Sequence, residues 1–424
     1  MHAVLVSIGT DGDIFPYAGL GATLRARGHR VTLAASEHYG PLASRHGFEF
    51  RSLVSKREND ELFEHPDFWN PLKTVTLSAR WGVRFIRRQY EMLSKHVTRD
   101  AVLVANPGVF AAGLAHEKLG VPWASLVLQP GIIPSSIAPP VMPCFTFLSR
   151  APRPIWKVFW RGLDLVGDLL VGPELNEVRR SLGLKPIRRL FQNWLSRQLV
   201  IGMFPDWYGA PQADWPSQMR LAGFPMFDGG TEDALPPEVS EFCRAGKPPV
   251  IFTFGTGMAH SASLFRTALE TCEVLGVRGI LLTKYRDQLP EKLPPTMLHC
   301  AFAPFQKLFP HCAAVVHHGG VGTTAKALSA GTPQLIHPLC FDQFDNGNRV
   351  KRLGAGDYLR SRNCSGQKMA AVLATVMADE TRTRCRELAA RFDGTDAFAE
   401  AADSIEALAK AHAGISPVHG IKKA

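Results

Sequence analysis

The amino-acid sequence predicts an α/β protein with two doubly wound domains, each built around a largely parallel sheet. The 424 residues are too many for one ordinary hydrophobic core, which favours two domains. Short apolar runs alternate with helix-like stretches across short connections, as when helices cross over between parallel strands. This alternation occurs twice, before and after a stretch rich in Pro, Gly and Asp at Gly223–Pro237.

The first half opens with a strand–helix–strand unit. Ala3–Ile8 is an apolar run, a turn containing Gly9 and Gly12 follows, and a helix-like stretch then continues until Gly28 ends it. The same rhythm predicts strands at 31–35, 101–105 and 123–128 and a helix at 108–119.

Two longer inserts interrupt this rhythm, at Leu53–Val97 and Ile132–Trp194. They contain many Phe, Trp, Leu and basic residues but have weaker strand–helix periodicity. Inserts of this kind in an α/β domain tend to carry specificity. We therefore expect them to form an apolar binding pocket; a helical cap that only covers the sheet is the alternative.

The second half repeats the pattern. It predicts strands at 250–254, 279–283, 313–317 and 334–337 and helices at 263–275 and 324–330. An Ala-rich stretch, Ala397–Ala411, predicts a last helix, and the tail after Gly414 is expected to fray. We place an N-terminal domain at 1–224 and a C-terminal domain at 225–396, with a helix at 397–413 packing back on the first. A ligand would bind between them, at the carboxyl ends of the strands.

The composition is that of a globular protein, with 46% hydrophobic and 20% charged residues. No run of 18 apolar residues predicts a transmembrane helix. The first residues have neither the basic region nor the apolar region of a signal peptide. Eight cysteines stand singly, as reduced thiols of a cytoplasmic protein do.

The net charge of +10 is concentrated in one region. Between Arg150 and Val200, ten Lys and Arg outnumber four Asp and Glu, and several Trp and Phe lie among them. This region is either a surface helix whose aromatic residues face the core, the commoner arrangement, or a site of peripheral contact with the inner face of a membrane. Nucleic-acid binding is not expected, because no nucleic-acid module is recognisable.

The most informative segment runs from His317 through Gly319, Gly320 and Gly322 to Thr323. A strand ends at the histidine, glycines follow, and a helix is expected to begin at the threonines. Glycines let the backbone approach a ligand closely, and a helix N-terminus offers free N–H groups and partial positive charge. The segment predicts an anion site, although it is not a Walker loop. A glycine-rich turn with a buried histidine is the structural alternative.

A second polar segment, Asp342 and Gln343, follows the strand that is expected to end at His337. A carboxylate beside a carboxamide places hydrogen-bond acceptors and donors side by side, which suits adjacent sugar hydroxyls. Taken alone, the pair is as easily a solvated polar turn.

From Phe302 to Arg349 the chain resembles the nucleotide-sugar binding signature of the family 1 GT-B glycosyltransferases. Plant, antibiotic and sterol glycosyltransferases share this signature. The resemblance implies a GT-B fold, in which two Rossmann-like doubly wound domains face each other across a cleft. It also implies that His317 contacts the diphosphate and that the turn at Gly319, Gly320, Gly322 and Thr323 supplies donors to it.

The same resemblance assigns further residues. Phe302 would stack on the nucleotide base, Asp342 and Gln343 would hold sugar hydroxyls, and Gly255 and Thr256 would lie beside the phosphates. Where plant members carry a glutamate for the ribose hydroxyls, this chain has Ala325. That departure is compatible with a dTDP donor, but some UDP-sugar enzymes also lack the glutamate, so the nucleotide stays open.

The N-terminal turn resembles the family's Gly-Asp/His-x-x-Pro turn, and this likeness makes Asp13 the catalytic base. Thr10 in the same turn would contact the diphosphate. The alternative is that Asp13 caps the first helix, although Asp11 is the expected cap. Plant members orient a histidine base with a second carboxylate, but the corresponding stretch here holds Asn106, so Asp13 is expected to act alone.

These features predict an inverting glycosyltransferase that moves a hexose, from dTDP-rhamnose or UDP-glucose, to a hydroxyl of a hydrophobic small-molecule or lipid acceptor. Segments such as Gly223–Gly229 resemble the branch that contains the rhamnolipid rhamnosyltransferases. The nucleotide sugar is a co-substrate and no cofactor is expected. No metal is expected either, because the histidines show no metal-ligand spacing. A non-hydrolysing nucleotide-sugar epimerase and a non-catalytic partner protein are the alternatives.

Overall fold

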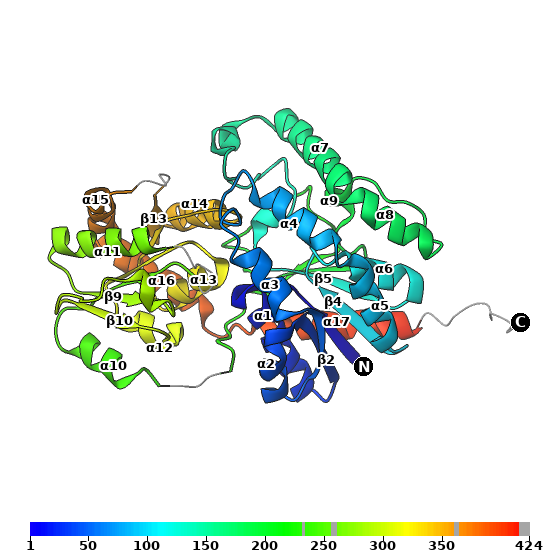
Figure 1. The fold of residues 1–424 in the computed structure, drawn as a ribbon, viewed down its shortest axis with the longest axis horizontal. Helices are drawn as coiled ribbons and strands as arrows, with labels where there is room; N and C mark the ends of the chain where they lie inside the picture. The colour runs from blue at the N-terminus through cyan, green and yellow to red at the C-terminus, as the bar shows by residue number, and fades with distance from the viewer. Residues whose placement is uncertain (231–233, 256–260, 360–363, 415–424) are drawn as a thin grey trace, which may run out of the picture.

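The computed structural model describes residues 1–230, 234–255, 261–359 and 364–414. The described chain forms two α/β halves, each with its own parallel sheet (Figure 1). Thr256 and the tail after Gly414, for which the sequence made predictions, lie outside the described residues. No helix in the described ranges has the length and apolar character needed to cross a membrane.

The strands of the first half, in chain order, are β1 (His2–Val6), β2 (Arg30–Ser36), β3 (Glu49–Val54), β4 (Ala101–Ala105), β5 (Trp123–Val127), β6 (Leu199–Gly202) and β7 (Met219–Leu221). Those of the second half are β8 (Val250–Thr253), β9 (Gly279–Leu282), β10 (Met297–Cys300), β11 (Ala314–His317), β12 (Gln334–Ile336) and β13 (Gly356–Tyr358).

The helices of the first half are α1 (Asp11–Ala26), α2 (Gly40–Arg45), α3 (Lys56–Phe63), α4 (Thr74–Val83), α5 (Ile86–His96), α6 (Phe110–Leu119), α7 (Arg153–Leu170), α8 (Gly172–Ser181) and α9 (Leu190–Asn193). The remaining helices are α10 (Pro237–Arg244), α11 (Ala262–Leu275), α12 (Phe305–Leu308), α13 (Val321–Ser329), α14 (Gln343–Leu353), α15 (Gly366–Val376), α16 (Asp379–Ala389) and α17 (Ala397–Gly414).

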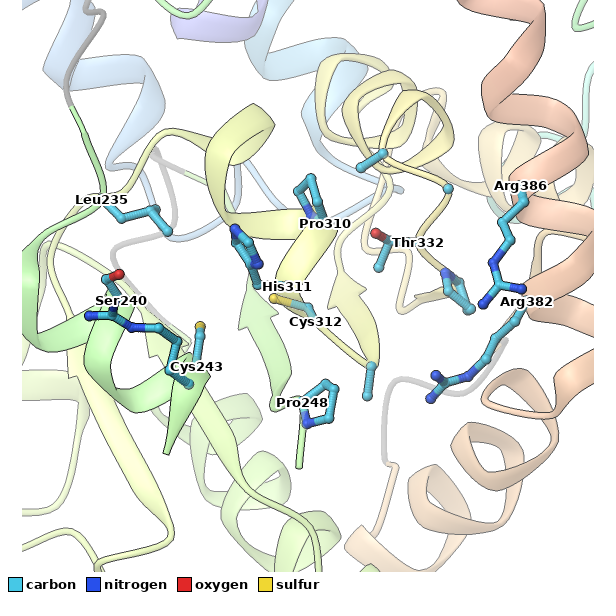
Figure 2. Close-up of a pocket in the computed structure, with 15 residues that line it drawn as sticks. Leu235, Ser240, Cys243, Pro248, Pro310, His311, Cys312, Thr332, Arg382 and Arg386 are labelled. Atoms are coloured by element: carbon cyan, nitrogen blue, oxygen red, sulfur yellow. The ribbon is translucent and has the colours of Figure 1, made fainter. Parts of the chain in front are cut away.

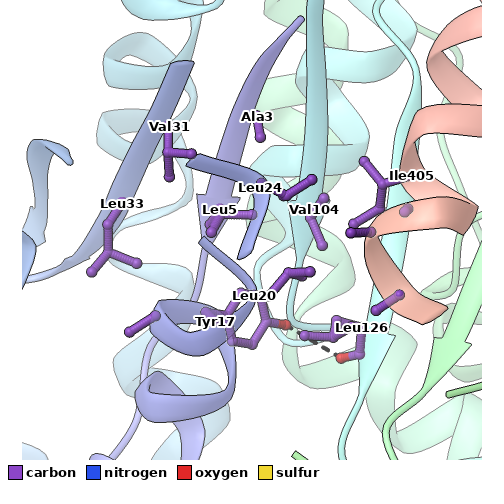
Figure 3. Close-up of a cluster of buried hydrophobic side chains, with 14 of the residues drawn as sticks. Ala3, Leu5, Tyr17, Leu20, Leu24, Val31, Leu33, Val104, Leu126 and Ile405 are labelled. Carbon is purple, nitrogen blue, oxygen red and sulfur yellow. Dashed lines mark hydrogen bonds between the residues drawn. The ribbon is translucent and has the colours of Figure 1, made fainter. Parts of the chain in front are cut away.

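The first sheet has the strand order β3-β2-β1-β4-β5-β6-β7, and every pairing in it is parallel. Successive side chains of β1 enter different cores, because side chains alternate between the two faces of a strand. Leu5 packs with Tyr17 and Leu126 on one face (Figure 3), whereas Val4 and Val6 pack on the other. Both faces are therefore covered, as a doubly wound sheet requires.

The second sheet has the order β10-β9-β8-β11-β12-β13 and is also wholly parallel. Phe252 of β8 enters one core and Ile251 the opposite one. The prediction of two doubly wound α/β domains is thus confirmed.

The last helix returns to the first half. α17 packs along α1, where the ring of Phe398 occupies the space beside Gly19: a Cβ on Gly19 would lie 2.3 Å from the ring. His29 Nε2 also lies 2.8 Å from Glu406 Oε1. The chain therefore crosses between the halves twice, which ties the two sheets together.

The inserts of the first half fold into helices. Leu53–Val97 contains α3, α4 and α5, and Ile132–Trp194 contains α7, α8 and α9. α4 contacts α7, so the two inserts meet each other (Figure 1).

Two local predictions were wrong. The helix expected from Thr324 begins at Val321, with Gly320 as its N-cap, because Gly322 and Thr323 are accommodated in its first turn. The cap of α1 is Thr10 and not Asp11, whose carboxylate Oδ1 accepts a hydrogen bond of 3.0 Å from the Tyr39 hydroxyl.

Candidate active site

The glycine-rich segment lies where β11 ends and α13 begins. Gly319 has a φ of +96°, and a Cβ there would lie 2.7 Å from Ile336, so this turn needs glycine to pack against β12. A Cβ on Gly322 would meet nothing within 4 Å, which leaves the first turn of α13 open to a ligand. Gly320 as N-cap and Thr323 in the first turn belong to a helix N-terminus, which favours anions.

His317 lies beneath this turn. Its side chain is fully buried; Nδ1 accepts a hydrogen bond of 3.1 Å from the backbone N–H of Gly319, and Nε2 lies 3.0 Å from Gln334 Oε1. Burial and the adjacent His318 lower the pKa of His317 to about 3. A neutral ring with Nε2 protonated fits both contacts, so both ring nitrogens are engaged within the protein.

The neighbouring His318 is placed differently. A Cβ on Gly255 would lie 3.0 Å from its ring, and one on Gly320 would lie 2.7 Å from its Nε2, so the ring sits between the two predicted phosphate turns. Its Nδ1 is buried and has no hydrogen-bond partner among the described residues. Burial lowers the pKa of His318 to about 4. Sequence alone offers no reason to prefer His318 over His317, because only their packing distinguishes the two side chains.

The predicted sugar pair lies at the start of α14. Asp342 Oδ2 accepts a hydrogen bond of 2.6 Å from the amide of Asn346, and that amide also donates to Gly319 O at 2.8 Å. Gln343 Oε1 accepts from the backbone N–H groups of Leu339 and Cys340, at 2.8 and 3.1 Å. Asn346, which was not predicted as a site residue, therefore positions Asp342 against the glycine turn.

Asp13 occupies the N3 position of α1. Its Oδ2 accepts hydrogen bonds from the backbone N–H and the hydroxyl of Thr10, at 2.9 and 3.2 Å. This fold-back requires Gly9, with φ +152°, because a Cβ there would lie 2.2 Å from that oxygen. Asp13 Oδ1 has no hydrogen-bond partner within the described ranges. Thr10, the N-cap of α1, thus holds Oδ2 of Asp13 in place. The other carboxylate oxygen, Oδ1, is left for another partner.

Asp13 and Asp342 approach each other from the two halves. Burial is the main cause that raises the pKa of Asp342 to about 7, and the charge of Asp13 raises it further. Burial also raises the pKa of Asp13, against the lowering effect of the Thr10 hydrogen bonds. The predicted base, Asp13, and the predicted sugar ligand, Asp342, therefore lie close enough for the charge of Asp13 to affect the pKa of Asp342 across the junction, by which we mean the contact between the two halves.

Helix α14 connects the two halves by hydrogen bonds beside Asp13 and Asp342. Asp345 Oδ1 accepts a hydrogen bond of 3.0 Å from the Val141 backbone N–H, and its Oδ2 accepts 2.7 Å from Arg349 Nε. The Tyr208 hydroxyl donates to Asn346 Oδ1 at 2.8 Å. These segments follow β5, β6 and β12, so the carboxyl ends of both sheets meet here, as expected.

Aromatic side chains also cross the junction. Phe341 has a φ of +54°, which is uncommon for a residue with a side chain. Its ring lies 5.3 Å from that of Phe68 and 6.3 Å from that of Trp69, which belong to the first insert. The residue before Asp342 therefore contacts the predicted acceptor domain.

The remaining predicted residues lie on the second half. Phe302 follows β10 and is 57% exposed, and Gly255 follows β8 with a φ of +99°. A cavity of about 450 Å³ opens at the opposite end of this sheet, beside Pro248, Ala313 and Pro333, which precede β8, β11 and β12 (Figure 2). It contains none of the predicted site residues.

Comparisons with known proteins agree with this geometry. Residues 3–133 match the family model for the glycosyltransferase family 28 N-terminal domain, and residues 279–408 match that for the erythromycin biosynthesis protein CIII-like C-terminal domain. Glycosyltransferase GtfE of Amycolatopsis orientalis is 29% identical over 420 residues, covering 95% of this chain and 96% of the relative. A sterol 3-beta-glucosyltransferase of Neosartorya fischeri is 27% identical over 429 residues, covering 96% of this chain and 29% of the relative.

The fold is shared with a solved structure, the spinosyn rhamnosyltransferase SpnG complexed with thymidine diphosphate. The TM-score is 0.69 at 18% identity, over 96% of this chain and all of that one (100%). Two family models that match the two halves, relatives that align with nearly the whole chain, and this common fold lead to one conclusion. The chain is a glycosyltransferase enzyme with the two-domain GT-B fold, similar to antibiotic and sterol glycosyltransferases.

Proposed function

We propose that this glycosyltransferase inverts the sugar it transfers, with Asp13 as the general base. The observation that carries the proposal is the approach of Asp13 on the first half to Asp342 on the second, beside the glycine turn. The acceptor hydroxyl would give its proton to Asp13 while its oxygen attacks the anomeric carbon. The bond from that carbon to the diphosphate oxygen would break, and the nucleotide diphosphate would leave from the opposite face.

The C-terminal half would stabilise the leaving diphosphate. The N-terminus of α13 offers backbone N–H groups and partial positive charge to a developing anion. The free Nδ1 of His318 adds a polar atom at the same turn, whereas both nitrogens of His317 are engaged. We therefore propose that His318 supplements or replaces the predicted contact of His317 with the diphosphate.

For the donor we propose dTDP-rhamnose, with UDP-glucose as the second candidate. Ala325 at the ribose position suits a deoxyribose, because the methyl side chain of alanine has no donor or acceptor for ribose hydroxyls. The solved relative SpnG is named a rhamnosyltransferase and was complexed with thymidine diphosphate. Its name and ligand support a dTDP-sugar here but belong to that protein.

For the acceptor we propose a hydrophobic molecule with a free hydroxyl, bound between the inserts of the first half. Phe68 and Trp69 of the first insert meet Phe341 beside the proposed sugar site. An apolar pocket with few polar groups would accept lipid, sterol or aromatic alcohols with modest discrimination.

We also propose that transfer requires no divalent metal. No three His, Cys, Asp or Glu side chains gather as metal ligands in the described ranges. Asp11 and Asp13 are close in sequence, but they bind Tyr39 and Thr10 respectively. Equal turnover with and without EDTA tests this proposal. A cytoplasmic location is likewise proposed, and all eight cysteines are free thiols, as is typical of cytoplasmic proteins.

A donor screen tests the reaction. The protein is incubated with labelled dTDP-rhamnose or UDP-glucose, with and without a phenolic or hydroxy-fatty-acid acceptor. Labelled product that depends on acceptor, with inverted anomeric configuration by NMR, is the expected result. Interconversion of the donor sugar without acceptor would instead support the epimerase alternative, which the comparisons do not favour. Retained configuration would overturn the proposed mechanism.

A further inference from the structure

Helix α7 exposes an apolar face that the described chain leaves uncovered. Ile155, Val158, Leu165, Val166 and Leu169 are all exposed, with values of 68% for Val158, 61% for Leu165 and 67% for Leu169. Their spacing places them on one side of the helix, since 3.6 residues make one turn. We call these five residues the α7 stripe. A contiguous exposed apolar surface of this kind marks an interaction site.

The stripe is not the side that holds α7 in the fold. On the other side, Trp156 is fully buried and its Nε1 donates to Leu148 O at 3.1 Å. Trp160 Nε1 donates to Ser135 O at 2.9 Å. The fold therefore uses one face of α7, as the sequence predicted for its aromatic residues, and leaves the stripe without a structural role.

The carboxylates of α7 also face the protein. Asp164 accepts a hydrogen bond from the Gln192 backbone N–H at 3.2 Å, and Asp168 accepts from those of Arg189 and Leu190, at 2.9 and 3.1 Å. Both acids are used to cap the α9 segment. The solvent side of α7 is therefore left with its basic residues alone.

Four basic residues border the stripe near the start of α7. Arg150, Arg153, Lys157 and Arg161 are all exposed, and none forms an ion pair within the described ranges. The preceding turn adds aromatic surface: Phe147 is 74% exposed, and the ring of Phe145 lies 6.3 Å from it and 5.1 Å from Phe159 of α7. Apolar and cationic surfaces are thus continuous.

We propose that the α7 stripe, Phe147 and these four basic residues form a docking surface for an anionic phospholipid bilayer. An interfacial helix of this kind buries its apolar face at the headgroup boundary while Lys and Arg meet anionic headgroups. A second copy of the chain would present the same cations, and α7 offers no outward carboxylate to pair with them. The charge therefore favours lipid over self-association.

This surface connects to the active site through one short segment. Trp160 holds Ser135, and the same loop continues to Val141, whose backbone N–H binds Asp345 of α14. The proposed docking surface and the active site are therefore joined by one loop. The docking surface stands independently of which sugar or acceptor is used.

Vesicle co-sedimentation tests the proposal on the full chain. The probes are phosphatidylcholine vesicles with and without about one third phosphatidylglycerol. We expect the wild type to sediment with the anionic vesicles, and less so at high salt. A V158E/L165E/L169E variant should bind about tenfold less, and K157Q/R161Q should lose the preference for anionic vesicles. Val274→Glu, on the exposed face of α11 in the other half, is the matched control and should bind like wild type.

Circular dichroism and thermal unfolding establish that each variant is folded, which is expected because the changed side chains are exposed. No sedimentation of the wild type with either vesicle would overturn the proposal. Equal binding to neutral and anionic vesicles would overturn its electrostatic part. Light scattering tests whether a second copy of the chain covers the stripe instead. A wild-type dimer that becomes a monomer in the triple variant, together with no vesicle binding, would assign the stripe to self-association.

Discussion

The two halves of the molecule share one architecture but use their strand ends differently. In the C-terminal half the strands β8, β11 and β12 lead through short turns directly to the predicted donor residues. In the N-terminal half, one such turn carries Asp13, whereas the helical inserts α3–α5 and α7–α9 extend two other connections, from β3 to β4 and from β5 to β6. In the proposed function, the short glycine turns would bind the diphosphate, which is common to all nucleotide sugars, and the long inserts can vary with the acceptor. The difference separates constant chemistry from specificity.

The largest effect on turnover should come from substitution of Asp13, which follows the first turn of the N-terminal half. Asp13→Asn should slow transfer roughly 10²- to 10⁴-fold, because it removes the proposed base while its amide can still face Thr10. Affinity for the nucleotide diphosphate, measured by calorimetry, should stay near wild type. Asp11→Asn in the same turn is the matched control, because Asp11 binds Tyr39 instead. Unchanged turnover of Asp13→Asn would place catalysis elsewhere.

Exchange of the inserts tests the proposed division of labour. Replacing Leu53–Val97 and Ile132–Trp194 by those of a relative with another acceptor should change the ratio of kcat/KM between two acceptors roughly 10- to 100-fold. The ratio between dTDP- and UDP-sugars should not change, because the proposed donor residues lie outside both inserts, all but Thr10 on the other half. A change in donor preference alone would show that the halves have been assigned in reverse.

Substitution of the two adjacent histidines tests which of them contacts the diphosphate in the C-terminal half. His318→Ala should weaken nucleotide diphosphate binding about tenfold, the worth of one hydrogen bond to a charged group. His317→Ala should chiefly lower the thermal midpoint, since its ring joins Gly319 to Gln334. Calorimetry and thermal unfolding of both variants separate these effects. Weaker binding for His317→Ala at an unchanged midpoint would restore the assignment made from the family resemblance.

The last effect concerns stability and not turnover, and it arises from pH and the core of the C-terminal half. His337 is fully buried, no described residue hydrogen-bonds its ring, and burial lowers its pKa to about 4. Its unfolded pKa is higher, so unfolding takes up a proton and stability falls as pH drops below about 6.5. At pH 5 this costs about 2 kcal/mol. His337→Leu should lose less stability to urea between pH 7 and pH 5 than the wild type does. An identical loss would show that His337 does not titrate on unfolding.

Central strands could be predicted from sequence because both faces are buried and the run is wholly apolar, as in Ala101–Ala105. The unpredicted strands β3, β7, β10 and β13 are the four sheet edges, and their partly or fully exposed positions break the apolar pattern. β6 (Leu199–Gly202) is buried, but it is short and follows the irregular insert, so the sequence pattern did not distinguish it from its surroundings. Periodicity thus finds strands only where burial is complete.

The sequence by itself determined the fold class, the two domains, and the segments at which a nucleotide sugar and a base would act. These are local properties: apolar periodicity, glycine turns and polar residues at strand ends. Only the tertiary structure decided that Asn346 holds Asp342 against Gly319 and that α7 turns its acids inward. It also decided which histidine keeps a free nitrogen. Those outcomes depend on contacts between residues distant in the chain, which local patterns in the sequence do not reveal.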